Sequence, residues 1–160
     1  MQRIPIFLEN KQFDNIANKI YETYPKACIL FIDLIDNPQL KKVYNDYKEK
    51  LIEKRGSVKE LELFHGTHAN LIDIIAEEGF DPAKNVVSAY GKGSYFSSTA
   101  AYSFHYMKSS DKEGISYMFL AKVLQGKIGE DISIAGNIHV MPVWQGAYPE
   151  YVIAFYKNAQ

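Results

Sequence analysis

Two stretches of the chain repeat apolar residues at the spacing of an α-helix. The first, residues 13–24, stops before Pro25 because a proline disfavours helical backbone at the residue before it. Its apolar positions are Phe13, Ile16, Ile20 and Tyr24. The second begins at Pro38, a residue suited to the first helical position, and ends at Gly56. Its apolar positions are Leu40, Val43, Tyr44, Tyr47 and Leu51.

Short apolar runs rich in β-branched and aromatic residues predict the strands. Two of them, residues 28–35 and 61–64, lie among the helices, and shorter helices are expected over 70–78 and 99–107. Three further runs fill the last part of the chain: 115–124, 138–144 and 150–156. Because helices come first and strands dominate the end, the pattern favours an α+β fold over a doubly wound sheet.

Length and composition predict a single compact domain over residues 1–160. Apolar residues make up 47% of the 160 residues and aromatic residues 14%, enough to build a sizeable core, so intrinsic disorder is excluded. Long repeats, low-complexity tracts and Pro/Ser-rich linkers are absent from the sequence.

The charge balance and the cysteine count narrow the function classes. The 18 basic and 19 acidic residues give a net charge of −1, which argues against nonspecific binding of nucleic acid or an anionic membrane. The lone Cys28 rules out an intrachain disulfide and a thiolate zinc site. With no bilayer-length apolar run and no signal-peptide pattern, we expect a soluble monomer in the cytoplasm, with the nucleus as the alternative.

The segment Gly91-Lys92-Gly93-Ser94 resembles a phosphate-binding loop in composition only. A P-loop needs a different glycine spacing, and the dinucleotide fingerprint needs three glycines opening a helix. Here the glycines lead into the aromatic pair Tyr95-Phe96, which favours a tight turn into a strand.

His65 and His68 look like half of a metal site, but neither a third ligand nor a cysteine pair accompanies them. No metal is therefore expected. His65-Gly66-Thr67 at a strand end also fits a binding loop, because glycine lets backbone groups approach a ligand closely. Sequence alone leaves a binding loop and an ordinary strand end both open.

The segment 99–106 offers hydroxyl and aromatic side chains on one predicted helical face. Ser103 and Tyr106 lie three positions apart, with Thr99 near the same face. Together they suit a flat polar heterocycle, held by a hydrogen bond and by stacking. The alternative is that Tyr102 and Tyr106 are only core aromatics. A hydrolase is not supported, because a Gly-x-Ser-x-Gly elbow is missing.

Taken together, these motifs resemble the catalytic domain of the poly(ADP-ribose) polymerases, closest to the mono-ADP-ribosylating, macrodomain-associated branch. The resemblance covers residues 13–156, most strongly 61–156. The matching segments are Leu63-Phe-His-Gly-Thr67, Gly79-Phe80, Tyr90-Gly-Lys-Gly-Ser-Tyr-Phe-Ser97, Tyr102-Ser103, Tyr106, Met118–Gly126 and Ala147–Ile153. It implies the ADP-ribosyltransferase fold, with two packed, mainly antiparallel sheets flanked by helices.

The resemblance also implies an NAD⁺ site and no metal requirement. Gly66 would hydrogen-bond the nicotinamide carboxamide through its backbone, and the Ser103 hydroxyl would contact the carboxamide oxygen. Tyr106 would stack on the nicotinamide ring, with Tyr95 on the opposite side. His65 would bind the adenosine ribose. Further along the donor, Thr67 and Asn70 would contact the adenosine portion, and residues 81–90 would form a covering loop.

Ile138 occupies the third position of the family's His-Tyr-Glu triad when the spacing is counted back from residues 147–151. The residues implied at the triad are His65, Tyr95 and Ile138. An isoleucine cannot activate an acceptor hydroxyl, so we expect single ADP-ribose units and no polymer. The segment 126–147 is shorter than in typical relatives, and a gap there would bring Glu130 or Asp131 toward the site instead.

The function expected is an NAD-dependent protein mono-ADP-ribosyltransferase that releases nicotinamide. Its acceptor is expected to be a protein, with the chain itself among the candidates. One alternative is an inactive interaction module of the same fold. The other is an ADP-ribosyl- or phosphotransferase acting on nucleic acid. The nucleic-acid alternative is weakened because the only arginines, Arg3 and Arg55, lie outside the motifs.

Overall fold

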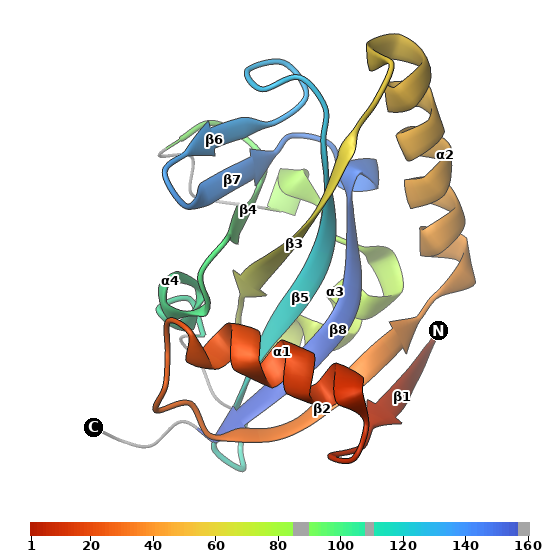
Figure 1. The fold of residues 1–160 in the computed structure, drawn as a ribbon. Coiled ribbons are helices and arrows are strands. Elements are labelled where there is room, and N and C mark those ends of the chain that lie inside the picture. The colour runs from red at the N-terminus through yellow and green to blue at the C-terminus, as the bar shows by residue number, and fades with distance from the viewer. Residues whose placement is uncertain (85–89, 108–110, 157–160) are drawn as a thin grey trace.

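The computed structural model describes residues 1–84, 90–107 and 111–156 (Figure 1). Within these residues eight strands form one sheet, and every neighbouring pair of strands in it is antiparallel. The order across the sheet is β1-β2-β8-β5-β3-β4-β7-β6. The strands are β1 (Gln2–Ile6), β2 (Ile29–Asp36), β3 (Lys59–Gly66), β4 (Ser94–Ser97), β5 (Ile115–Gln125), β6 (Ser133–Ala135), β7 (Ile138–Met141) and β8 (Ala147–Tyr156). The predicted α+β class is confirmed.

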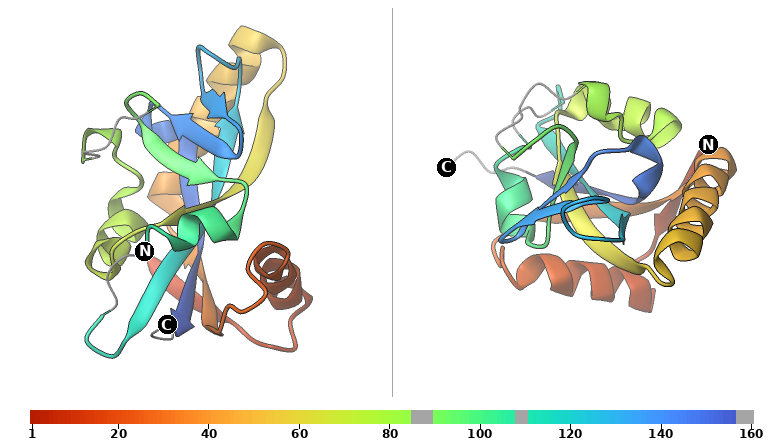
Figure 2. Two further views of the ribbon diagram at one scale, coloured as in Figure 1. Left: turned by 90° about the vertical axis from the view of Figure 1, so that its left-hand side faces the viewer. Right: turned by 90° about the horizontal axis from the view of Figure 1, so that it is seen from above.

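Helices cover the sheet on both faces. α1 lies across one face and α3 across the other, while α2 runs beside the sheet (Figures 1 and 2). The α-helices are α1 (Lys11–Tyr21), α2 (Pro38–Arg55), α3 (Ile72–Glu78) and α4 (Ala100–Phe104), and the 3₁₀ turns are η1 (Ala69–Leu71), η2 (Pro82–Lys84) and η3 (Trp144–Gly146). Asparagine caps begin the two longest helices: the side chain of Asn10 accepts from the Gln12 amide, and that of Asn37 from the Leu40 amide.

Two apolar clusters, one on each face, bury the central strands. On the first face α1 packs Phe13, Ile16 and Ile20 against the sheet, and on the other α3 and the segment after it pack Ile72 and Phe80. β5 and β8 take part in both clusters, so they are buried on both sides. This is why the two strands read as nearly continuous apolar runs, whereas a half-exposed strand alternates.

The predicted division into two sheets is not confirmed. Hydrogen bonds join all the described strands, and the link between β3 and β4 is the single pair Phe64 and Ser97. By contrast, the register of β3 with β5 runs over eight pairs, from Lys59–Gln125 to Gly66–Met118. A strand pattern shows which residues are buried but not which strand lies beside which, so the sequence does not reveal this narrow link.

Several predicted boundaries differ from the structure. The helix expected over 99–107 ends at Phe104, so Tyr106 lies in the turn after α4. The run 138–144 ends as a strand at Met141, because Pro142 has no N–H for the ladder. β1 and β6 were not predicted, being short and partly exposed. Much of the covering loop expected over 81–90 lies outside the described residues.

Candidate active site

His65 lies one residue before the end of β3 and is fixed by a neighbouring strand. Its Nδ1 lies 2.6 Å from the backbone carbonyl oxygen of Tyr95 in β4. A carbonyl oxygen only accepts hydrogen bonds, so Nδ1 carries the proton and donates, and Nε2 keeps an unprotonated lone pair. His65 therefore offers a hydrogen-bond acceptor to a ligand hydroxyl.

The surroundings of His65 keep its ring neutral. The rings of Phe80 and Phe96 lie 5.0 Å and 5.4 Å from the imidazole, centroid to centroid. Burial among these rings lowers the pKa of His65, and the hydrogen bond to Tyr95 opposes that shift only in part. The sequence alone does not predict that these two phenylalanine rings pack against the His65 imidazole. Gly79-Phe80 and Phe96 belong to the recognised motifs, but their packing on His65 depends on the folded sheet.

Gly66 is pressed against the backbone of α4. A Cβ atom built on Gly66 would lie 1.9 Å from the carbonyl oxygen of Ser103 and 3.3 Å from the Cβ of Tyr106. No side chain fits in that space, because real Cβ atoms do not approach other atoms so closely. The close approach brings together three predicted site residues from β3 and the α4 region. Ser103 itself is buried, with 3% of its surface exposed, whereas Tyr106 is 42% exposed.

The Tyr95 hydroxyl group hydrogen-bonds the turn that precedes β4. The hydroxyl donates to the carbonyl oxygen of Gly91, at 2.7 Å, and accepts from the amide of Tyr90, at 2.8 Å. These bonds close the glycine turn that leads into the strand. Gly93 in that turn lies against β7, since a Cβ there would lie 2.6 Å from the Met141 carbonyl oxygen. The prediction of a tight turn into a strand, rather than a phosphate loop, is confirmed.

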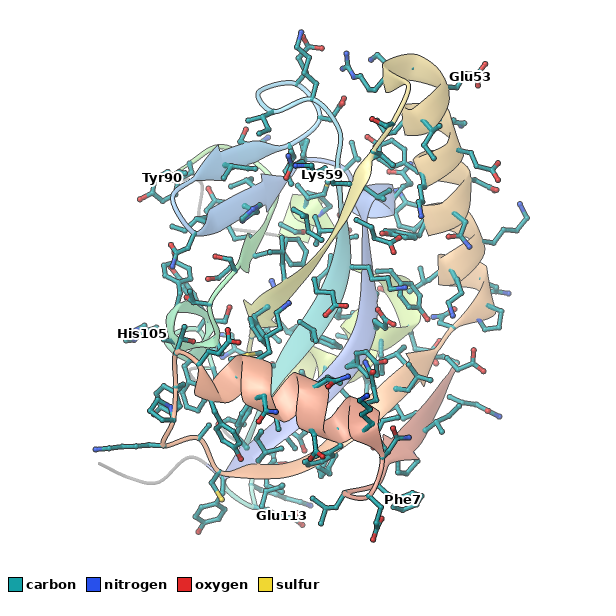
Figure 3. The ribbon with its side chains drawn as sticks, in the orientation of Figure 1. Phe7, Glu53, Lys59, Tyr90, His105 and Glu113 are labelled. Atoms are coloured by element: carbon teal, nitrogen blue, oxygen red, sulfur yellow. The ribbon has the colours of Figure 1, made fainter. Side chains whose placement is uncertain are left out.

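A pair of tyrosines borders the site on the α4 side. The hydroxyl oxygens of Tyr102 and Tyr106 lie 3.0 Å apart, and their ring centroids 5.3 Å. Burial, and then the hydrogen bond to Tyr106, raise the pKa of Tyr102 to about 12, so the Tyr102 hydroxyl stays protonated at neutral pH. Figure 3 shows Tyr90 and His105 on the side of the molecule where β4, β7 and α4 lie. The hydroxyl pair could not be predicted from the sequence alone.

Thr99 begins α4 and ties it to β4 and to the turn before β7. Its side-chain oxygen accepts from the Tyr102 amide and lies 3.2 Å from both the Ser97 hydroxyl and the Asn137 side-chain nitrogen. Thr99 is the N-cap of α4. α4 is thus positioned by polar contacts to the strands that flank it.

Ile138 begins β7 beside β4. It is buried and pairs with Ser97, while Tyr95 pairs with Val140 two residues further on. Directly paired residues share a face of an antiparallel sheet, so Ile138 and Tyr95 lie on the same face of neighbouring strands. The role of Ile138 in the triad stays a prediction.

Glu130 and Asp131, the acidic residues expected near the third triad position if a gap shifts the register, are engaged elsewhere, as is Glu150. Asp131 accepts from Arg55 Nε at 2.9 Å, and Glu130 accepts from Arg55 Nη2 at 2.8 Å. Glu150 lies 3.6 Å from the ammonium group of Lys122. Arg55 lies in α2 and Lys122 in β5, whereas the candidate site is built on β3, β4 and β7. The alternative in which Glu130 or Asp131 approaches the site is therefore not supported.

The remaining predicted contacts follow β3 directly. Thr67 is buried and Asn70, in η1, is exposed. His65 is half-buried and His68 exposed, and no group of three His, Cys, Asp or Glu side chains within the described ranges is arranged to hold a metal. Among the same residues, no helix is long and apolar enough to cross a membrane.

The fold and the site together define a class of protein. An antiparallel sheet carries His-Gly at the end of one strand and a tyrosine on the next. The short helix that follows holds a buried serine, and a tyrosine pair spans this helix and the turn after it. Residues 10–137 match the family model described as the poly(ADP-ribose) polymerase catalytic domain. The chain belongs to this family.

Three human relatives in this family carry the name protein mono-ADP-ribosyltransferase. PARP12 is 36% identical over 130 residues, which cover 79% of this chain and 18% of PARP12. PARP11 is 31% identical over 147 residues, 78% of this chain and 44% of PARP11. PARP14 is 28% identical over 183 residues, 96% of this chain and 10% of PARP14. The chain thus spans less than half the length of these relatives.

Proposed function

We propose that the protein is an NAD-dependent mono-ADP-ribosyltransferase that moves ADP-ribose to a protein side chain and releases nicotinamide. Family membership and the names of the relatives support the reaction class. The observation that carries the proposal is the contact of Gly66 with Ser103 and Tyr106. It brings the end of β3 against the Ser103 backbone and the Cβ of Tyr106, which supports a shared role for these three residues.

Each group then has a role that suits its chemistry. The amide and carbonyl of Gly66 and the Ser103 hydroxyl hold the nicotinamide carboxamide, and the rings of Tyr95 and Tyr106 enclose the nicotinamide. The Nε2 lone pair of His65 accepts a hydrogen bond from a ribose hydroxyl. Thr67 and Asn70 contact the adenosine portion.

In the reaction, the bond between ribose C1′ and the nicotinamide nitrogen breaks, and a bond from C1′ to the acceptor nucleophile forms. Nicotinamide leaves with the bonding electron pair, and the acceptor loses its proton or is already an anion. Hydrogen bonds to the carboxamide make the ring a better leaving group, and rigid aromatic walls hold it in line while the bond breaks. Binding energy at the nicotinamide end therefore increases the rate as well as the affinity.

Labelled NAD⁺ tests the proposal directly. The protein is incubated with it and with a cell extract, and the labelled product is then treated separately with protease and with nuclease. Label removed only by protease supports a protein ADP-ribosyltransferase. Label removed only by nuclease would instead establish the nucleic-acid alternative, and no label, with no binding of NAD⁺, would establish the inactive interaction module.

Benzamide, which mimics nicotinamide, tests the site residues. It is expected to raise the melting temperature, because a ligand that binds only the folded state stabilises it. Ser103→Ala and Tyr106→Ala should each abolish that rise. Tyr156→Ala, which replaces a tyrosine 50% exposed at the far end of β8, is the matched control and should leave it unchanged. A rise that persists in both site variants would contradict the assignment.

The product is expected to be single ADP-ribose units. Ile138 has no group to activate an acceptor hydroxyl, and a general base is worth roughly 10²–10⁴ in rate, whereas an acidic side chain supplies its own nucleophile for the first transfer. Modified protein should run as a discrete band. A ladder that a polymer-specific glycohydrolase collapses would show that the triad assignment is wrong.

The proposed reaction also needs no metal ion, since its leaving group is activated by hydrogen bonds and not by a metal-bound water. Treatment with a chelator should therefore leave the transferase activity unchanged. Activity that is lost with the chelator and restored by Zn²⁺ would contradict this part of the proposal.

A further inference from the structure

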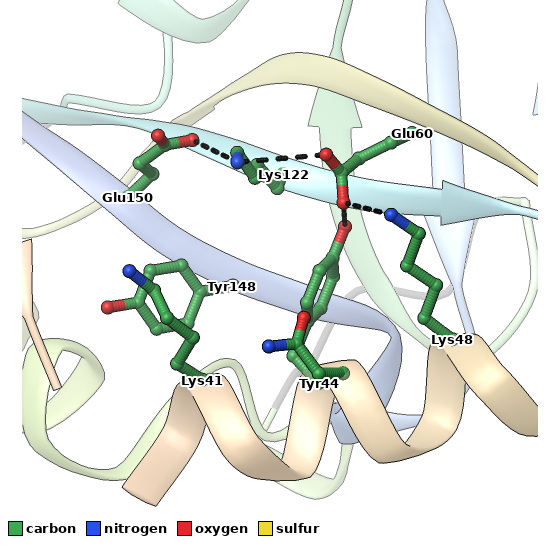
Figure 4. A pocket seen from close by; sticks show the side chains of 8 residues that line it. Lys41, Tyr44, Lys48, Glu60, Lys122, Tyr148 and Glu150 are labelled. Atoms are coloured by element: carbon green, nitrogen blue, oxygen red, sulfur yellow. Dashed lines mark hydrogen bonds and ion pairs between the residues drawn. The ribbon is translucent and has the colours of Figure 1, made fainter. Parts of the chain in front are cut away.

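A polar cavity lies between α2 and the strands beside it, away from the candidate active site. It encloses about 260 Å³ (Figure 4). α2 contributes Lys41, Asn45 and Lys48, and the strands β3, β5 and β8 contribute Glu60, Lys122 and Glu150. None of these residues takes part in the proposed reaction.

The helical repeat places these α2 side chains on the cavity. Positions 41, 45 and 48 are four and three residues apart, so they share one face of the helix, beside Tyr44. Tyr44 and Tyr148 are almost fully buried behind them, with ring centroids 6.2 Å apart. The cavity therefore has an aromatic back wall and a charged entrance.

Glu60 organises the charges inside the cavity. Its carboxylate accepts a hydrogen bond from the Tyr44 hydroxyl at 2.8 Å and lies 3.4 Å from the Lys48 nitrogen and 3.6 Å from the Lys122 nitrogen. Lys122 in turn reaches Glu150, also at 3.6 Å. Figure 4 shows Lys122 between the two carboxylates. The network fixes the lysine side chains before any ligand arrives.

The network leaves positive charge and hydrogen-bond donors unused. An ammonium group has three N–H donors, and Lys122 has two carboxylate neighbours and Lys48 one. Lys41 lies over the ring of Tyr148, 5.6 Å from its centroid, and no carboxylate of the described residues is within 4 Å of its nitrogen. Three ammonium groups and two carboxylates make the cavity positive in a chain whose net charge is −1.

We propose that this cavity binds a phosphorylated sugar. The positive charge selects an anion, and lysine ammonium groups bind a phosphate group as point charges. Glu150 and the Asn45 amide oxygen offer acceptors for sugar hydroxyls beside the phosphate. A volume just below the roughly 300–1,000 Å³ of drug-sized pockets suits one sugar ring with its phosphate.

The cavity is a separate site and not an extension of the candidate active site. Glu60 and His65 both lie in β3, five residues apart, so their side chains point to opposite faces of the sheet. At about 3.4 Å per residue, their backbones are roughly 17 Å apart. Occupancy of one site does not block the other.

Ribose 5-phosphate is the probe for the test, with ribose and inorganic phosphate as separate arms. It is titrated into isotope-labelled protein while backbone amide signals are followed by nuclear magnetic resonance. We expect saturable shifts at Asn45 and Lys122, no shift at Ser103, and weaker binding of ribose and of inorganic phosphate.

Substitutions of lysines on α2 test whether the cavity itself binds the probe. Lys41→Gln with Lys48→Gln should weaken binding by at least about tenfold, and Lys41→Gln alone should weaken it while leaving the Glu60 network intact. The matched control is Lys50→Gln, an exposed lysine on the same helix outside the cavity, which should bind as before.

Four results would overturn the proposal. The first is the absence of saturable shifts at the cavity, and the second is shifts centred on Ser103 instead. The third is an equal loss of binding in Lys50→Gln, which would indicate diffuse attraction. The fourth is binding of ribose or of inorganic phosphate as tight as that of ribose 5-phosphate. Equal binding of ribose would show that the phosphate does not contribute, and equal binding of inorganic phosphate would show that the sugar does not.

Discussion

At the scale of single residues, one hydrogen bond decides what His65 presents to a ligand. Its Nδ1 proton is committed to the Tyr95 carbonyl oxygen at 2.6 Å, so the free nitrogen of the ring is an acceptor. The same bond ties the ring to the strand that carries the Tyr95 side chain. A change in β4 therefore moves two proposed NAD⁺ contacts at once.

Stability is expected to fall as the pH drops below about 6.5. Partial burial lowers the pKa of His65, and burial in β7 lowers that of His139, so both stay neutral in the folded protein. The unfolded chain takes up these protons near pH 6.5, the ordinary value, and the folded chain only at lower pH. The unfolded state then binds more protons, which favours unfolding. Urea unfolding between pH 5.5 and 8 measures the effect.

The double variant His65→Gln/His139→Gln should flatten this pH dependence, and His105→Gln, at an exposed position after α4, is the control that should keep it. An unfolding free energy that stays constant from pH 8 to 5.5 in the unmodified protein would refute the argument.

Gly66→Ala is expected to remove benzamide binding. The added methyl group would lie 1.9 Å from the Ser103 carbonyl oxygen, so α4 must shift away from β3, at a cost of about 1–3 kcal/mol in stability. The loss is seen as an absent melting-temperature rise. Gly129→Ala is a stability control: Gly129 has a φ of +94° with open space around it, so alanine is strained there but far from Ser103. Retained benzamide binding in Gly66→Ala would contradict the proposed slot.

At the scale of elements, the end of α2 is attached to the turn after β5. The Arg55 guanidinium contacts Asp131 at 2.9 and 3.1 Å and Glu130 at 2.8 Å, and the Lys127 amide donates to the same Asp131 carboxylate at 2.7 Å. These contacts hold the pKa of Asp131 below its usual range, with the Arg55 hydrogen bond as the largest cause. The longest helix is thus fixed at its C-terminal end by a nearly buried carboxylate.

Arg55→Met should lower the free energy of unfolding by about 1–3 kcal/mol, because Asp131 is left buried without its main partner. Chemical denaturation measures the loss. Lys42→Met removes the exposed pair of Lys42 with Asp46 on the same helix and should leave stability nearly unchanged, because exposed ion pairs contribute little. Equal effects of the two substitutions would show that the Arg55 contacts do not anchor the helix.

At the scale of the whole molecule, the sequence predicts the parts better than their arrangement. Helical spacing and Pro38 locate the long helices, and the apolar runs locate β5 and β8, because these signals are local. The order of strands across the sheet depends on contacts between distant residues and was not predicted. Likewise the motifs identify His65 and Ser103, whereas the hydroxyl pair of Tyr102 and Tyr106 depends on side-chain orientations that the sequence does not give.

The central place of β8 determines when this protein can become folded during its synthesis. β8 is the last strand of the described chain, yet it lies between β2 and β5 and pairs Phe155 with Ile29. When only residues 1–146 have left the ribosome, β2 and β5 are present but β8, which pairs with both, is not. Pairing between strands so far apart in the sequence is slow even once β8 has been made. Nascent chains stalled with residue 156 outside the tunnel should resist protease, and those stalled with residue 146 outside should be digested; resistance in both would show that the sheet assembles without its central strand.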